Sequence, residues 1–340
     1  LPLVVFELKN PLRESADLLQ AFNQFETYKD EIAELFVYNQ TLIISDGIAA
    51  RLGSLSADFQ RFTPWKVVDE KNQSARLYFE DELQSLFNGL MQPEHLLDYI
   101  RYFVLFERDS SGKTIKKIAA YHQYYGVNEA VASTIRATSE KGDRRIGVMW
   151  HTQGSGKSIS MLFYAGKLLA QAALQHPTLV VVTDRSDLDG QLFQTFSAGQ
   201  DLLKQAPVQA DSREDLRRAL AARAAGGVFF TTVQKFGLND GEDRFPVLNV
   251  RRNIIVISDE AHRSQYGFGL KVSNGQMRAG YARHLRDALP NAAFIGFTGT
   301  PLSLEDKDTQ EVFGRYVSVY DLQDAVEDGA TVPIVYEARQ

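Results

Sequence analysis

Residues 146–158 read Ile-Gly-Val-Met-Trp-His-Thr-Gln-Gly-Ser-Gly-Lys-Ser. The first five residues predict a short, mainly apolar strand, and the glycines after it let the backbone curl so that several N–H groups face one phosphate. The helix expected next adds the positive end of its dipole. In this pattern Lys157 reaches the terminal phosphates of a nucleotide, and the Ser158 hydroxyl binds Mg²⁺. The segment therefore predicts a phosphate-binding loop.

The match to the phosphate-loop pattern is a relaxed one. The strict pattern has glycine at the position of His151. A Gly-rich turn without function is the alternative interpretation, but the strand before the loop and the helix after it favour a nucleotide site. The residues expected to contact the nucleotide are Thr152, Gly154, Ser155, Gly156, Lys157 and Ser158.

Short apolar runs alternate with longer helical stretches after about residue 115. Strands are predicted over residues 146–150, 179–183, 228–232, 254–258 and 293–297, and helices over residues 158–174, 188–196, 213–225 and 276–289. Such an alternation predicts an α/β fold with a parallel sheet covered on both faces. Ligands of such sheets bind at the carboxyl ends of the strands.

A pair of acids follows the strand at residues 254–258. The sequence there continues as Asp259-Glu260-Ala261-His262. A carboxylate such as Asp259 can hold Mg²⁺ through water, and Glu260 can orient and deprotonate an attacking water. The acidic start of a solvated helix is the alternative. Together with the phosphate loop, the pair predicts a site that hydrolyses ATP, with His262 linking it to the rest of the molecule.

Three further segments lie at strand ends, at residues 180–185, 231–236 and 297–301. With the loop and the acidic pair, they resemble the ordered motifs of a superfamily 2 helicase. The resemblance implies a RecA-like motor lobe that uses ATP and Mg²⁺. Threonine hydroxyls and backbone amides at strand ends suit contacts to DNA phosphates, although residues 298–301 could also be a simple turn. The residues implied in DNA contact or coupling are Asp184, Arg185, Thr232, Gln234, Thr298, Gly299 and Thr300.

The segment Tyr-His-Gln-Tyr-Tyr at residues 121–125 is similar to the adenine-recognising motif of these helicases. The Gln123 amide offers both a donor and an acceptor to the adenine edge. A glutamine without a specific role is the alternative.

The beginning of the chain carries a different set of residues. Glu7 and Lys9 fall on one face of a strand predicted at residues 3–8, and Gln24 and Tyr28 fall on one face of a helix predicted over residues 18–35. A carboxylate and an ammonium at this spacing can bind a metal and steady the scissile phosphate. The pattern resembles the Asp…Glu-x-Lys nucleases that carry Gln-x-x-x-Tyr, which implies Glu7 as a metal ligand and all four residues as catalytic.

The metal-binding aspartate of that family is absent from the six residues before Glu7. We expect it to precede the present sequence, so that this chain alone does not cut DNA. The expected domains are a nuclease part at residues 1–80, a helical linker at 81–115, the RecA-like lobe at 116–320 and the start of a second lobe at 321–340. Without the arginine that a second lobe supplies, nucleotide hydrolysis is expected to be weak.

A nuclease ahead of a superfamily 2 motor resembles the restriction subunit of type I restriction–modification enzymes. Residues 103–109, 151–158, 184–189 and 320–333 carry this resemblance. It implies an enzyme that translocates double-stranded DNA with ATP, works with methylation and specificity subunits, and cleaves at a distance.

Composition is compatible with this expectation. The chain has no cysteine, 44% hydrophobic and 24% charged residues, and a net charge of −6. It therefore has no disulfides or thiolate metal sites and fits a prokaryotic cytoplasm, with no membrane partner expected. A stand-alone helicase or repair helicase-nuclease is one alternative function. A nucleotide-gated DNA-binding scaffold is another, although Lys157, Asp259 and Glu260 are all present.

Overall fold

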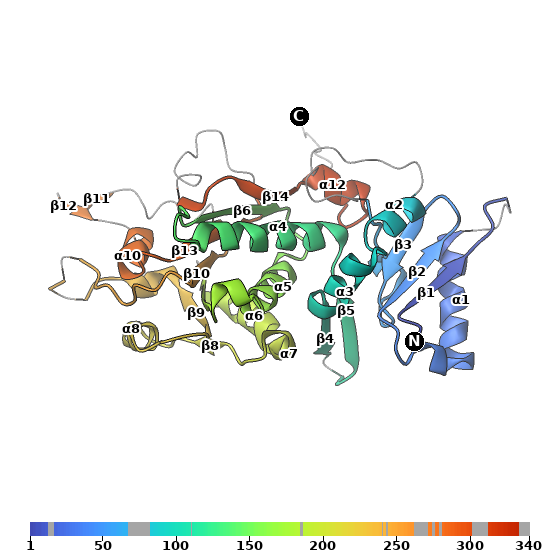
Figure 1. The fold of residues 1–340 in the computed structure, drawn as a ribbon, viewed down its shortest axis with the longest axis horizontal. Coiled ribbons are helices and arrows are strands. Elements are labelled where there is room, and N and C mark those ends of the chain that lie inside the picture. Colours follow the sequence, from blue (N-terminus) through green and yellow to red (C-terminus); the bar gives the residue numbers. More distant parts are fainter. Residues whose placement is uncertain are drawn as a thin grey trace, which may run out of the picture. The chain divides into compact units, whose positions relative to one another are not determined.

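The computed structural model describes residues 1–340 except residues 13–16, 67–81, 110, 184–185, 240, 243, 262–270, 274–275, 279–280, 301–311 and 333–340. The chain divides into two compact units (Figure 1). The first unit comprises Leu1–Tyr125 with Leu322–Gln340, and the second comprises Gly126–Asp321.

The second unit is built around a seven-stranded sheet in which every neighbouring pair is parallel. The strand order is β14-β6-β13-β10-β7-β9-β8. All five predicted strands are confirmed. The sheet also contains two edge strands, β14 and β8, that the apolar pattern did not predict. The strands are β6 (Arg145–His151), β7 (Thr178–Thr183), β8 (Val208–Gln209), β9 (Val228–Thr232), β10 (Ile254–Ser258), β13 (Ala293–Thr298) and β14 (Tyr316–Tyr320).

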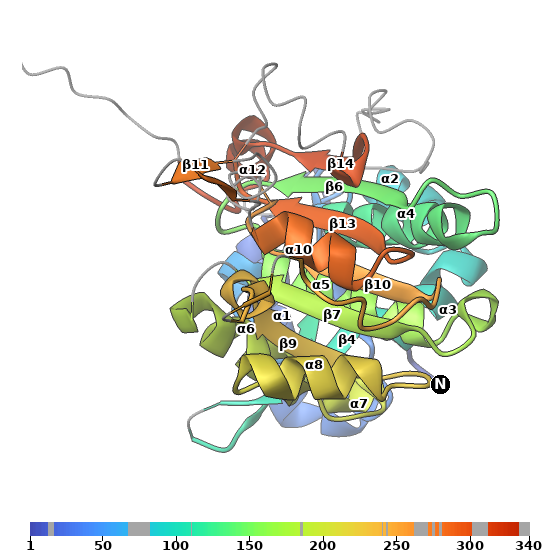
Figure 2. The ribbon, with the colours of Figure 1, turned by 90° about the vertical axis from the view of Figure 1, so that its left-hand side faces the viewer.

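Helices cover both faces of this sheet (Figure 2). On one face, the ring of Phe196 on α6 packs edge-on against the ring of Phe230 on β9. The ring centres of Tyr164 on α5 and Phe297 on β13 are 6.1 Å apart. On the other face, α8 and α10 join a core that includes strand residues of β7 and β10. The predicted two-sided parallel fold is therefore confirmed. The helices are α4 (Tyr121–Thr138), α5 (Lys157–Leu169), α6 (Ser186–Ala198), α7 (Gln200–Leu203), α8 (Arg213–Ala221) and α10 (Tyr281–Ala288), with short 3-10 turns η4 (Ala172–Leu174) and η5 (Val233–Phe236).

The helix predicted over residues 276–289 is wrong at its start. Residues Gln276–Arg278 form β12, which pairs antiparallel with β11 (Lys271–Ser273), and α10 begins only at Tyr281. The sequence contains Asn-Gly at residues 274–275 and a second glycine at 280. Asn-Gly is a strong hairpin signal, and glycine disfavours a helix interior. The helix was predicted from the spacing of apolar residues alone, which does not take these two features into account.

The first unit contains a small three-stranded sheet with α1 packed on it. Strand β1 pairs parallel with β2, and β2 pairs antiparallel with β3. Ala21 and Phe25 of α1 share a core with Leu42 and Ile44 of β2. This confirms the strand predicted at residues 3–8, and the helix predicted over residues 18–35 is confirmed as far as Glu31. The elements are β1 (Val4–Leu8), α1 (Leu18–Glu31), η1 (Ala33–Phe36), β2 (Thr41–Ser45), β3 (Ala50–Gly53) and η2 (Phe59–Arg61).

The helical linker expected at residues 81–115 is not helical throughout its length. It contains α2 (Glu82–Asn88) and α3 (Pro93–Tyr102), and then β4 (Val104–Arg108) forms a hairpin with β5 (Thr114–Ile118). Proline at the first position of α3 starts a new helix, and the following Phe-Val-Leu-Phe run favours a strand. The expected helical linker at 81–115 thus includes a hairpin. The last helix of this unit is α12 (Leu322–Glu327), after which Asp328 pairs with Lys66 at 2.5 Å.

Candidate active sites

The phosphate loop follows β6 directly. The Thr152 N–H donates to the Tyr320 carbonyl at 2.9 Å, and the Ser155 hydroxyl donates to the Thr152 carbonyl at 2.6 Å. Gly154 and Gly156 have φ angles of 88° and 83°, a region that favours glycine. Glycine at position 156 has no side chain with which to cap α5, so the helix N-terminus can receive a phosphate. The structure therefore confirms the strand, loop and helix arrangement predicted for residues 146–158.

Lys157 lies in the electrostatic field of the two acids. Burial lowers the pKa of the Lys157 ammonium, and the Glu260 and Asp259 carboxylates act in the opposite direction. These acids come from the end of β10, which is separated from β6 by β13. The sheet thus brings together two motifs that lie far apart in the sequence.

The segment after β13 fills the space between these motifs. A Cβ atom added to Gly299 would lie 2.9 Å from Lys157 Nζ. The buried Thr298 hydroxyl donates to the Thr300 carbonyl at 3.1 Å and accepts from the Thr300 N–H at 3.2 Å. The segment is therefore a closed turn, as one interpretation held, and it also lies against the phosphate loop.

Glu260 has an unusual backbone conformation. Its φ angle is +49°, in the left-handed region, and its N–H donates to the Asp259 carboxylate at 3.0 Å. The Asp259 N–H donates to the Val182 carbonyl of β7 at 2.9 Å. A non-glycine residue in this region costs about 1–2 kcal/mol, and such strain concentrates at functional sites.

Three predicted site residues, Asp184, Arg185 and His262, lie outside the described residues. Ser158 is exposed in the first turn of α5, Thr232 is buried at the end of β9, and Gln234 is exposed in η5. All the described members of the motor motifs therefore lie at or just beyond the carboxyl ends of the parallel strands, as predicted.

Gln123 is buried at the start of α4, in the first unit, with 6% of its surface exposed. Its side-chain carbonyl accepts the Ala120 N–H at 2.9 Å. This bond caps the beginning of the helix and occupies the acceptor that adenine recognition would use. The adenine-binding role of Gln123 remains a prediction.

His151 has a role that the sequence did not suggest. It is fully buried at the end of β6, and its Nε2 lies 2.8 Å from the Ser318 hydroxyl of β14. The residue that departs from the strict phosphate-loop pattern therefore ties the loop to the neighbouring strand. In the sequence, this role of His151 was indicated only by its position at the end of an apolar strand.

The predicted nuclease residues lie on neighbouring elements of the first unit. Lys9 Nζ is 2.8 Å from Glu7 Oε1 on β1, and both side chains are partly buried. Gln24 and Tyr28 are both partly buried on α1, which packs on the same sheet. The described part of the chain contains no cluster of three or more acidic, histidine or cysteine side chains able to hold a metal. The nuclease metal site is therefore not complete within the described residues.

The family models divide the chain in the same way as its motifs. Residues 122–340 match SWI2/SNF2 ATPases, and residues 1–61 match the N terminus of the type I restriction enzyme R protein. A parallel sheet that sets a phosphate loop against Asp259 and Glu260 is typical of the ATP-binding lobe of a helicase-like motor. The chain belongs to the SWI2/SNF2 ATPase family. Its sequence is also similar to those of the endonuclease subunits of type I restriction enzymes.

Curated relatives support this assignment. The chain is 84% identical over its whole length to the type I restriction enzyme HindI endonuclease subunit of Haemophilus influenzae. It is 38% identical, again over its whole length, to a putative type I restriction enzyme endonuclease subunit of Methanocaldococcus jannaschii. The chain spans 32% of the length of each relative.

Among solved structures, the chain is similar to a fragment of a putative HsdR subunit from Vibrio vulnificus, at 15% sequence identity and a TM-score of 0.38. The match covers 93% of this chain and 47% of the Vibrio chain. The fold assignment comes from the strand order itself. Among the described ranges, no helix is long and apolar enough to cross a membrane.

Proposed function

We propose that this chain contains the first ATP-binding lobe, and part of the nuclease, of a subunit that translocates double-stranded DNA and couples this movement to endonucleolytic cleavage. The observation that carries the proposal is that the phosphate loop follows β6 and the acids Asp259 and Glu260 follow β10, two strands away at the same edge of the sheet, so that both carboxylates act on the Lys157 ammonium. The 84% identity to a type I restriction endonuclease subunit supports the restriction role.

The residues of the ATP site have separate roles in this proposal. Amides of the phosphate loop and Lys157 hold the phosphates, and Glu260 orients and deprotonates the attacking water. Ser158 and Asp259 supply the hard oxygen ligands that Mg²⁺ prefers, and the ion would neutralise charge on the phosphates. The turn at Thr298, Gly299 and Thr300 would transmit the state of the nucleotide, because it lies against Lys157.

DNA contacts are proposed at the carboxyl edge of the sheet, through Asp184, Arg185, Thr232 and Gln234. The nuclease part would use Glu7 and Lys9 with Gln24 and Tyr28. The functional division into residues 1–80, 81–115, 116–320 and 321–340 is part of the same proposal. The partners would be methylation and specificity subunits, in a prokaryotic cytoplasm.

Displacement of a DNA triplex tests translocation directly. The full-length protein would be assembled with methylation and specificity subunits on DNA that carries a recognition site and a distant triplex. We expect ATP-dependent displacement by the natural protein and by Glu94→Gln, a change on helix α3 of the first unit. Glu260→Gln should bind ATP without displacing the triplex. ATP hydrolysis without displacement by the natural protein would rule out the translocation role.

A further inference from the structure

The amino edge of the seven-stranded sheet carries a row of arginines. Strand β6 starts at Arg145, directly after Arg144. Arg251 and Arg252 lie just before β10, and Arg315 directly precedes β14. Because all these strands are parallel, their amino ends share one edge, opposite the carboxyl edge that carries the nucleotide motifs. We define the arginine edge as Arg136, Arg144, Arg145, Arg223, Arg251, Arg252, Arg286 and Arg315.

These guanidinium groups are close enough to repel one another. Burial and the charge of Arg252 lower the pKa of Arg144, and burial and Arg223 lower the pKa of Arg251. Burial and the charge of Arg145 lower the pKa of Arg286 to about 10. The repulsive pairs are Arg144 with Arg252, Arg251 with Arg223 and Arg286 with Arg145, so guanidinium groups from neighbouring segments lie near one another along this edge.

Backbone carbonyls, rather than acids, hold most of this row. Arg144 donates to the Thr138 carbonyl at 2.9 Å, Arg252 to Glu140 O at 2.9 Å and Arg286 to Val312 O at 2.6 Å. Within the described ranges, Arg136 is the only member in an ion pair, with Glu129 at 2.7 Å. Carbonyls orient a guanidinium without neutralising its charge. Positive charge is therefore concentrated here in a chain whose net charge is −6.

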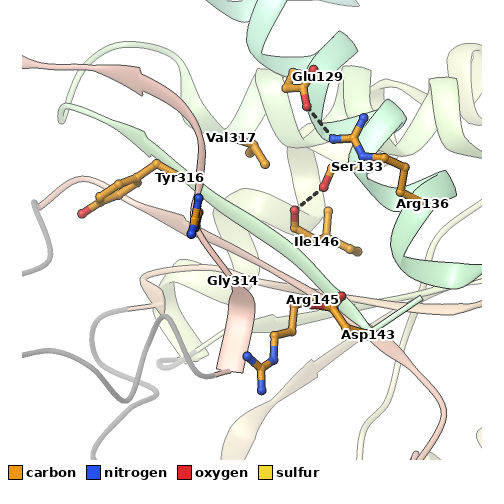
Figure 3. Close-up of a pocket in the computed structure, with 10 residues that line it drawn as sticks. Glu129, Ser133, Arg136, Asp143, Arg145, Ile146, Gly314, Tyr316 and Val317 are labelled. Atoms are coloured by element: carbon orange, nitrogen blue, oxygen red, sulfur yellow. Dashed lines mark hydrogen bonds and ion pairs between the residues drawn. The ribbon is translucent and has the colours of Figure 1, made fainter. Parts of the chain in front are cut away.

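A cavity of about 640 Å³ lies at one end of the arginine edge (Figure 3). Its lining includes Arg136, Arg145 and Arg315, with Ser133, Asp143 and Tyr316. Figure 3 shows Arg136 held by Glu129 and Ser133 bonded to the Ile146 carbonyl. Arg145 and Arg315 are exposed, and their side chains form no hydrogen bond or ion pair with the residues that the structure describes. These two guanidinium groups are therefore available to an anion.

We propose that the arginine edge binds the phosphate backbone of duplex DNA, as a second contact on the side of the lobe opposite the nucleotide site. The inference rests on the proposed function as a DNA motor. Guanidinium forks match phosphate oxygens in a bidentate geometry, which a row of lysines would not provide. Such contacts hold DNA in register without reading its sequence. The second contact would keep the duplex bound while the carboxyl-edge contacts release and rebind.

The dimensions of the edge fit this ligand. From β14 to β9 there are five strand spacings of about 4.8 Å, or roughly 24 Å. That length corresponds to about seven base pairs at 3.4 Å each. A protein partner would need an apolar interface core, whereas the cavity is lined mainly by charged and polar side chains. The observations therefore favour a linear polyanion over an acidic protein surface.

Binding of a short labelled duplex, without recognition site or ATP, tests the proposal in the full-length protein across a salt series. Arg145→Gln/Arg315→Gln removes two charges that have no described partner. We expect roughly tenfold weaker binding or more, and a slope of log affinity against log salt that is smaller by about 1.8. Arg218→Gln/Arg244→Gln is the matched control, because it removes two exposed charges of the same unit that are paired with Asp215 and Asp287.

The comparison of the salt slopes of the two double variants decides whether the arginine edge binds DNA. Equal slopes for the two double variants would overturn the proposal, while DNA binding by the natural protein would leave the motor function intact. No duplex binding by the natural protein would overturn the arginine-edge proposal alone, because the motor proposal concerns the complex assembled at a recognition site and is tested there by triplex displacement. Unchanged DNA binding with failed assembly of the other subunits would assign the edge to a protein partner instead. Arg145→Lys/Arg315→Lys retains both charges and should restore the slope, which separates lost contacts from misfolding.

Discussion

Gly299 lies against the ammonium of Lys157, so closely that a Cβ atom on Gly299 would stand 2.9 Å from Lys157 Nζ. The relationship depends on the strand order, because β13 lies between the strand of the phosphate loop and the strand of the acidic pair. The turn after β13 can therefore respond to the position of Lys157, and through it to the nucleotide.

Gly299→Ala should displace Lys157 from its present position. The added methyl group meets the end of the flexible Lys157 side chain, which can move aside at little cost in folding free energy but then leaves its place beside the phosphate loop. We expect ATP affinity to fall by roughly tenfold, measured by titration with a fluorescent ATP analogue. Gly190→Ala is the matched control, since a Cβ atom there meets nothing within 4 Å and the position is helical. Equal affinities for the two variants would contradict this account of Gly299.

Glu260→Gly should separate stability from activity. Glycine relieves the strain of a φ angle of +49°, so the free energy of unfolding should rise by about 1 kcal/mol. ATP hydrolysis should be lost, because the proposed base is gone. Urea unfolding and a phosphate-release assay measure the two effects. Glu94→Gly, in the first turn of α3, should destabilise the protein instead. A less stable Glu260→Gly protein would show that the left-handed conformation carries no strain.

Glu7→Ala/Lys9→Ala should abolish DNA cleavage by the full-length enzyme and leave its ATP hydrolysis unchanged. The side chain of Glu7 on β1 forms an ion pair with that of Lys9, one residue beyond the strand, and the proposed metal ligand is Glu7. The control removes a similar pair, through Glu26→Ala/Lys29→Ala on α1. Nicking of a plasmid and ATP hydrolysis would be followed in the same reactions. Cleavage by the Glu7/Lys9 variant would exclude this strand from the nuclease site.

The Arg217–Glu242 pair should make stability sensitive to acid. Hydrogen bonds from the Arg217 guanidinium and the Asn239 N–H lower the pKa of Glu242 from 4.5 to about 2. A lowered carboxyl pKa contributes stability above the unfolded pKa, and this contribution is lost as the pH falls from about 4.5 towards 2. Urea unfolding of Glu242→Gln should show a smaller loss over this interval than the natural protein. Glu31→Gln, an exposed change on α1, should behave like the natural protein.

The central sheet was predictable from the sequence because the inner strands β7, β9, β10 and β13 are buried along their full length, and β6 is buried over most of its length. Continuous apolar runs are typical of parallel strands that are covered on both faces. Strand β14, by contrast, lies at an edge and mixes exposed and buried positions. Its Tyr-Val-Ser-Val-Tyr sequence therefore lacks the apolar run that marked the inner strands.

Within the ATP site, the motifs predicted which residues would lie close together, but they did not predict the detailed geometry of their contacts. Spacing along the chain places Asp259 and Lys157 at strand ends, and the sheet order then brings them together. The left-handed backbone of Glu260 and the approach of Gly299 to Lys157 depend on tertiary packing. The bond from His151 to Ser318 also joins distant segments, so a local pattern contained no signal for it.

ATP hydrolysis by the full-length protein is the most direct test of the restriction-motor proposal. It would be measured on plasmids with and without a recognition site, with DNA alone and with methylation and specificity subunits added. The account predicts hydrolysis only when the partners and a site are both present. Hydrolysis with any DNA and no partners would contradict it and favour a stand-alone helicase, and no hydrolysis in any mixture would leave only a nucleotide-gated scaffold.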